Sequence, residues 1–234
     1  SIAESMGAEV IKFKWNGRLP KKGGWFLANY KIKTKWILFL DADEILTESF
    51  KSEIKKILPK TTFKGFYVSY SVYFLGKKLK GGIKMKKLSL FQTKYGSYEQ
   101  IEDDSSSKLD IEVHEHPIIQ GNVGSIKSEI DHKDFSGIER YIEKHNQYSS
   151  WETHRFLKIK NEFSKSNEFN KRQKFKYLIL ENPFSGVIYF MLQYFFLGGW
   201  RDGLAGFYFA LFKFSYFVQI SCKIHEQKFL IKKK

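Results

Sequence analysis

The sequence predicts an α/β fold, with a mostly parallel sheet followed by a C-terminal helical extension. The first observation is a run of five apolar residues at positions 36–40, which is short enough for a strand covered on both faces. The second is an alternation of helical and strand-like patterns up to about residue 135. The third is the region 136–234, where the patterns are mostly helical or continuously apolar.

Each expected element has a local signal. Gly7 ends a first helix over residues 1–6, and apolar residues alternate with lysines over residues 9–15, which is typical of a strand. Thr47 suits the N-cap of a helix that Pro59 ends. The remaining expected elements are a helix over 25–32, strands over 65–75 and 110–119, a helix from 136 to 156 or beyond, and apolar stretches over 183–197 and 204–220.

We expect two regions, an α/β domain over residues 1–135 and a helical region over residues 136–234. A chain of 234 residues is long enough for one such domain and a modest extension. Neither apolar stretch of the helical region reaches the ~20 residues that span a bilayer, and Arg201 and Asp202 separate the two. These stretches suit helices in a membrane interface, and packing on the chain's own domain fits them nearly as well.

The composition indicates a basic globular protein. Hydrophobic residues make up 42% and charged residues 28%, which excludes a disordered chain. The net charge of +15 favours an anionic partner, such as nucleic acid, a membrane surface or a polyphosphorylated substrate. Six lysines lie between Lys77 and Lys87, either as a solvated face or as a contact with such a partner. The single cysteine, Cys222, excludes an internal disulfide and fits a reducing compartment.

Three carboxylates, Asp41, Asp43 and Glu44, directly follow the apolar run. Ligands of open α/β sheets bind beyond the carboxyl ends of the strands, which is where these acids are expected. Asp41 and Asp43 are two residues apart, so in extended chain both can point to one side. Two such carboxylates suit Mg²⁺ or Mn²⁺ that already carries a phosphate.

Other interpretations of these acids are open. They can simply cap the next helix, which is the common role of acids at a strand end. A calcium loop is excluded, because its sixth and twelfth positions would hold Leu46 and Ser52 instead of Gly and Glu. A phosphatase of the haloacid dehalogenase type needs a later acidic pair after an apolar strand, whereas Asp103 and Asp104 lie in a polar run.

The motif at 36–44 resembles that of the family 2 glycosyltransferases, which have the GT-A fold. The resemblance extends to Asn29 in a helical segment before it, to Val113–Glu115, Gly121 and His132 after it, and to Trp200–Gly206. It is strongest for the bacterial branch that builds lipopolysaccharide core and surface polysaccharide. In that family an additional strand and an Asp-rich turn precede the segment at residue 1, so we expect this chain to lack them and to be inactive or feeble alone.

The resemblance implies roles for particular residues. Asp43 would hold the divalent metal ion, Asp41 would contact the ribose or the metal, and His132 would complete the metal site. Asn29 and Arg18 would lie at the nucleotide-sugar donor, with Lys21 or Lys22 as further partners of its diphosphate.

Glu115 is the expected catalytic base. Alternation over 110–119 places it on the apolar side of a strand, where burial suits a general base, and the resemblance places Val113–Glu115 near the acceptor. Glu112, Asp103 and Asp104 are the alternatives. His114 and His116 are weaker candidates for contacts with phosphate or metal than His132.

The expected function is inverting, metal-assisted transfer of a sugar from a nucleotide-sugar donor to a glycan or glycolipid acceptor. The expected location is cytoplasmic, peripheral on the inner face of the cytoplasmic membrane, with an anionic membrane surface as partner and no nucleic acid. The alternative is a basic, aromatic-rich module without catalysis that binds nucleic acid or lipid.

Overall fold

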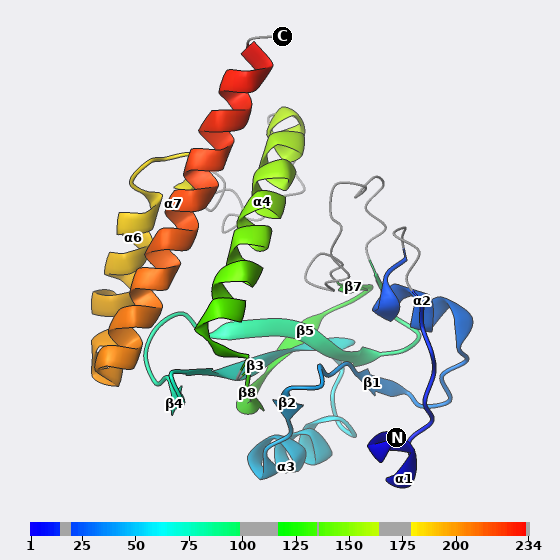
Figure 1. Cartoon of the computed structure of the whole chain (residues 1–234). Helices are drawn as coiled ribbons and strands as arrows, with labels where there is room; N and C mark the ends of the chain where they lie inside the picture. The colour runs from blue at the N-terminus through cyan, green and yellow to red at the C-terminus, as the bar shows by residue number, and fades with distance from the viewer. Residues whose placement is uncertain (15–19, 99–116, 135, 164–178, 233–234) are drawn as a thin grey trace. The chain divides into compact units, whose positions relative to one another are not determined.

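A computed structural model describes residues 1–14, 20–98, 117–134, 136–163 and 179–232 (Figure 1). The fold is mixed α/β, with a curled mixed sheet and a long C-terminal helix. The strands of the main sheet run in the order β1 (Trp36–Leu38), β5 (Met85–Gln92), β3 (Gly65–Phe74), β8 (Val123–His132) and β2 (Glu44–Ile45), and β4 (Lys77–Lys78) pairs with β3. A separate ribbon pairs β6 (Gly96–Tyr98) with β7 (Pro117–Ile119).

The α/β class is confirmed, but the expectation of a mostly parallel sheet needs correction. β1 pairs with β5, β2 with β8, and β4 with β3, and each of these ladders is antiparallel. For one of them the reason is local: β3 and β4 are joined by residues 75–76 alone, without the crossover of a dozen or more residues that parallel neighbours require. β1 ends the strand order and is only half-buried, so it is not the doubly covered strand that its apolar run indicated.

The three helices expected in the first part of the chain all form, but α2 (Lys22–Asn29) begins and ends three residues earlier than the helix expected over 25–32. α1 (Ile2–Ser5) ends before Gly7, whose φ of +84° suits a residue without a side chain. α3 (Glu48–Ile57) begins after Thr47, whose Oγ1 accepts a hydrogen bond from Phe50 N at 3.2 Å. The expected strand over 9–15 does not form in its described part, residues 9–14.

Contacts divide the chain into two units, each built from three segments. The first unit comprises Ser1–Asp41, Lys51–Val68 and Lys87–Lys127, and the second comprises Ala42–Phe50, Ser69–Lys86 and Ser128–Lys234. Strands β3, β5 and β8 therefore each contribute residues to both units. These units do not coincide with the expected regions 1–135 and 136–234, which remain a prediction.

The second unit holds the helices of the C-terminal part. They are α4 (Gly137–Phe163), α6 (Ser185–Met191), a π-helical turn η2 (Leu192–Phe196), a 3₁₀ turn η3 (Gly199–Asp202) and α7 (Leu204–Lys232). α7 lies beside both α4 and α6 (Figure 1). One apolar cluster of this unit joins Phe156, Leu180, Phe217, Ile220 and Ile224.

A second cluster joins the sheet to α7. Phe74 at the end of β3 and Leu79 after β4 pack with Ala205 and Phe209 of α7. Burying the three large side chains among them stabilises the unit by several kcal/mol, at about 1.5–3 kcal/mol each. α7 is therefore held by two side chains, Phe74 and Leu79, that precede it by more than a hundred positions.

Two ionisable side chains meet between α4 and α7. Lys213 Nζ lies 3.3 Å from His145 Nε2, and His145 Nδ1 lies 2.9 Å from Tyr141 O. Burial, together with the charge of Lys213, lowers the pKa of His145 to about 4, and burial lowers the pKa of Lys213 to about 8. A neutral imidazole that donates through Nδ1 and accepts from Lys213 through Nε2 satisfies both contacts.

We expect this histidine to make the fold sensitive to acid. Its pKa is about 4 when folded and about 6.5 when unfolded, so between those values the unfolded chain binds the extra proton. The free energy of unfolding should fall as the pH drops from 6.5 to 4, by on the order of 2 kcal/mol after allowance for partial solvent access. Urea unfolding across this range measures it.

Two variants make the pH experiment specific. His145→Gln keeps a neutral side chain and should flatten the decline, whereas His154→Gln, on the exposed side of α4, should leave it unchanged. An equally steep decline in His145→Gln would assign the acid sensitivity to other groups.

Candidate functional site: an Asp–His pair at the end of β8

Asp43 and His132 come together at the short ladder between β2 and β8. Glu44 pairs with His132 and Ile45 with Asp131 in the register, and Lys133 N donates to Asp43 O at 2.9 Å. This places His132 Nε2 3.2 Å from Asp43 Oδ2. The side chains are 23% and 37% exposed, so the pair is accessible to a ligand. Two residues expected at the metal site are thus neighbours, in the second unit.

The geometry of the pair fits one shared cation. Adjacent ligands of an octahedral ion with bonds of about 2.1 Å are about 3 Å apart, close to the observed spacing. Such ions are commonly held by one or two carboxylates, with substrate phosphates and water filling the other positions. No group of three or more His, Cys, Asp or Glu side chains within the described ranges could hold a metal by itself. The pair therefore suits a cation that arrives with a phosphate.

Asp41 has a different partner. Lys87 Nζ lies 2.6 Å from its Oδ2, within the first unit, and both side chains are partly exposed. This contact gives Asp41 a cationic neighbour from the lysine-rich segment, which sequence reasoning did not foresee. The only signal was the density of lysines between residues 77 and 87.

The other residues considered for the site either have different contacts in the structure or lie outside the described residues. Asn29 ends α2, and its Nδ2 donates to Trp25 O at 2.8 Å within the same helix. Glu44 is buried in β2, and the helix-capping role that it could have taken belongs to Thr47. Arg18, Glu115, Glu112, Asp103, Asp104, His114 and His116 lie outside the described residues.

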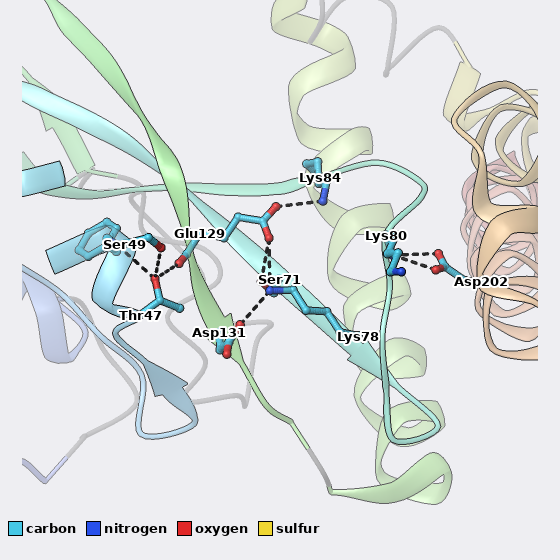
Figure 2. A network of polar contacts seen from close by, with 10 residues as sticks. Thr47, Ser49, Ser71, Lys78, Lys80, Lys84, Glu129, Asp131 and Asp202 are labelled. Atoms are coloured by element: carbon cyan, nitrogen blue, oxygen red, sulfur yellow. Dashed lines mark hydrogen bonds and ion pairs between the residues drawn. The ribbon is translucent and has the colours of Figure 1, made fainter. Parts of the chain in front are cut away.

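A polar network lies on the face of β8 opposite His132 (Figure 2). Lys84 Nζ donates to Glu129 Oε1 at 2.9 Å, Ser71 Oγ donates to Glu129 Oε2 at 2.9 Å, and Lys78 Nζ lies 3.2 Å from Asp131 Oδ1. Burial alone would raise the pKa values of Glu129 and Asp131, but these hydrogen bonds outweigh it and lower both. These ionised acids are neutralised by lysines, which makes the network structural.

Residue alternation along β8 separates the Asp43–His132 pair from the polar network. Ile130 and His132 project to one face of the strand, and Glu129 and Asp131 project to the other. Ile130 is fully buried, so the candidate pair lies at the end of a packed row of side chains. The strand thus holds His132 in place by the burial of its neighbours on the same face.

Comparisons of the chain with protein-family models, with curated proteins and with solved structures found no match. The functional assignment therefore depends on the chain's own residues and their geometry.

Proposed function

We propose that the chain is a metal-assisted, inverting glycosyltransferase of family 2 with the GT-A fold, which uses a nucleotide-sugar donor. The observation that carries the proposal is the Asp43–His132 pair. The apolar run that ends in Asp41, Asp43 and Glu44 suggested a cation site there, and a late histidine was expected to complete it. Two accessible ligands at a spacing suited to one ion support that proposal.

The chain's residues divide the chemistry between them. Asp43 and His132 would hold the divalent ion, which when bound would supply electrostatic stabilisation of the leaving diphosphate. The imidazole favours Mn²⁺ over Mg²⁺, because nitrogen is a softer ligand than carboxylate oxygen. By the same resemblance, Asp41 would contact the ribose or the ion. Asn29 and Arg18 position the donor.

The proposed transfer is a direct displacement at the anomeric carbon. Glu115 takes the proton of the acceptor hydroxyl, whose oxygen bonds to the anomeric carbon. The bond from that carbon to the diphosphate oxygen breaks at the same time, and the leaving nucleoside diphosphate takes the electron pair. Attack opposite the leaving group inverts the anomeric centre. The acceptor is a glycan or glycolipid, at the cytoplasmic face of a bacterial membrane.

The test is nucleoside diphosphate binding with and without Mn²⁺, measured by isothermal titration calorimetry. We expect binding that appears with Mn²⁺ and disappears when a chelator removes it. The alternative, a basic module without catalysis, gains support from the exposed lysines Lys80 and Lys86. It predicts binding of nucleic acid or another polyanion without metal, and that result together with no Mn²⁺-dependent binding would overturn the proposal.

A further inference from the structure

The helical hairpin of the second unit exposes an unusual amount of apolar surface. On its first arm the exposed side chains follow helical spacing, and on its second arm they do so again. We call residues 184–211 the apolar hairpin. Its exposed large apolar side chains are Phe184, Val187, Ile188, Met191, Leu192, Phe195, Phe196, Leu197, Trp200, Leu204, Phe207, Tyr208 and Leu211.

The hairpin carries almost no exposed charge. Arg201 and Asp202 are its only charged residues. Asp202 is 1% exposed, so its carboxylate faces inward. Arg201 is exposed, and its guanidinium lies 5.5 Å from the ring centre of Trp200. The exposed surface is therefore apolar with a single cation at its turn, an arrangement typical of residues at a lipid headgroup boundary.

A lysine-rich loop is fixed to the turn of this hairpin (Figure 2). We call residues 77–86 the basic loop. Lys80 N donates to both carboxylate oxygens of Asp202 at 3.0 Å, and Gly81 N donates to one at 2.9 Å. Lys77 Nζ also donates to Asp202 O at 2.9 Å.

The fit between loop and turn is close. Gly82 N donates to Leu197 O at 2.8 Å, and Ile83 N donates to Gln193 Oε1 at 2.8 Å. A Cβ at Gly81 would lie 2.2 Å from Gly198 O, so no larger residue fits there without a shift. The exposed Lys80 is thereby held beside the exposed apolar turn.

We propose that the apolar hairpin and the basic loop form one docking surface for an anionic lipid bilayer. Phe196, Trp200 and Leu204 enter the headgroup boundary, and Lys80 and Arg201 contact the lipid phosphates. This proposal does not depend on the proposed function. It assigns the docking contact to a surface that combines two segments far apart in sequence, residues 77–86 and residues 184–211.

Charge argues against a second copy of the chain as the occupant. A symmetric dimer buries the same patch of both subunits, which would bring Lys80 and Arg201 of one copy close to those of the other. Anionic headgroups neutralise the same cations instead. The net charge of +15 likewise favours an anionic partner over a second copy of the chain.

Interfacial docking also fits better than a membrane-spanning helix. Within the described residues, one helix, from Leu204 to Leu230, is long and apolar enough to cross a membrane. However, Phe209, Phe217, Ile220 and Ile224 of that helix are buried in the apolar clusters of the second unit. Insertion across a bilayer would remove them from those partners, whereas docking of the exposed stripe leaves the clusters intact.

The test is flotation of the full chain with phosphatidylglycerol vesicles and with phosphatidylcholine vesicles. We expect binding to the anionic vesicles that weakens with salt. Phe196→Ser combined with Leu204→Ser should reduce that binding at least about tenfold, because both side chains leave water on docking. The matched control is Ile2→Ser with Met6→Ser, at 85% and 83% exposure against 77% and 72% for the hairpin pair.

A charge series completes the experiment. Lys80→Glu with Arg201→Glu should reduce binding about tenfold or more, whereas Lys55→Glu with Lys56→Glu on α3 should reduce it far less. Circular dichroism and urea midpoints equal to those of the native chain exclude unfolding. Equal binding by the hairpin variant and its control would overturn the proposal. Binding that resists salt and alkaline extraction would also overturn it, because it indicates a membrane-spanning helix. So would a hairpin variant whose only change is conversion of a dimer to a monomer, because it indicates that the surface joins two copies of the chain.

Discussion

Replacing Asp43 with alanine should lower the Mn²⁺-dependent affinity for a nucleoside diphosphate by about a hundredfold, because loss of even an outer-shell partner of a metal ligand costs 10–100-fold. The carboxylate is one of two protein ligands in the candidate site, at 3.2 Å from His132 Nε2. Its loss would leave a single imidazole facing a divalent ion and a diphosphate. Calorimetric titration of the diphosphate at fixed Mn²⁺ measures the change.

Two further variants separate metal binding from general damage. His132→Gln keeps a polar side chain of similar reach and should lower Mn²⁺ affinity about tenfold, in line with the loss of one metal-site contact. Glu139→Ala removes an exposed carboxylate on α4 and should change nothing. Affinity within twofold of the native chain in Asp43→Ala would remove the basis of the enzymatic proposal.

Replacing Asp202 with alanine should lower the free energy of unfolding by about 3 kcal/mol, because each buried donor left without an acceptor costs about 1–3 kcal/mol. The carboxylate is buried and accepts hydrogen bonds from Lys80 N and Gly81 N. Without it, both amides lose their acceptor inside the junction of loop and turn. Urea unfolding followed by circular dichroism measures the loss.

A second variant, Asp202→Asn, tests whether the hydrogen bonds cause the loss. It keeps one acceptor oxygen, so its free energy of unfolding should fall by about half as much as that of Asp202→Ala. Glu143→Ala is the control, because its carboxylate makes an exposed ion pair with Arg140, and such pairs contribute about 0–1 kcal/mol. A loss below 0.5 kcal/mol in Asp202→Ala would show that the loop is held by its other contacts.

Local signals in the sequence predicted local structure well. The Thr47 cap is confirmed by its hydrogen bond from Phe50 N, because a cap depends on residues three positions apart. The strand over 65–75 is confirmed as β3, where aromatic and β-branched residues fill both faces. The meeting of Asp43 and His132 was expected from a family pattern, since nothing local to either residue indicates it.

Non-local pairing was the part that the sequence could not supply. Residues 9–14 alternate like a strand, but alternation does not provide the neighbouring strand whose hydrogen bonds make one. The partners of Asp202 are backbone amides in a loop more than a hundred residues earlier, and amides carry no residue-specific signal. The Gly81–Gly82 and Gly198–Gly199 pairs lie where the two backbones approach closely, but in the sequence either pair also suits an ordinary turn.

The interleaving of the two units sets how the chain can be divided. A fragment that begins at residue 136 keeps α4, α6 and α7 but omits Phe74 and Leu79, against which Phe209 packs. It also omits the amides that Asp202 accepts from. Truncation at that point would therefore remove part of the packing of α7, while its contacts with α4 and α6 would remain.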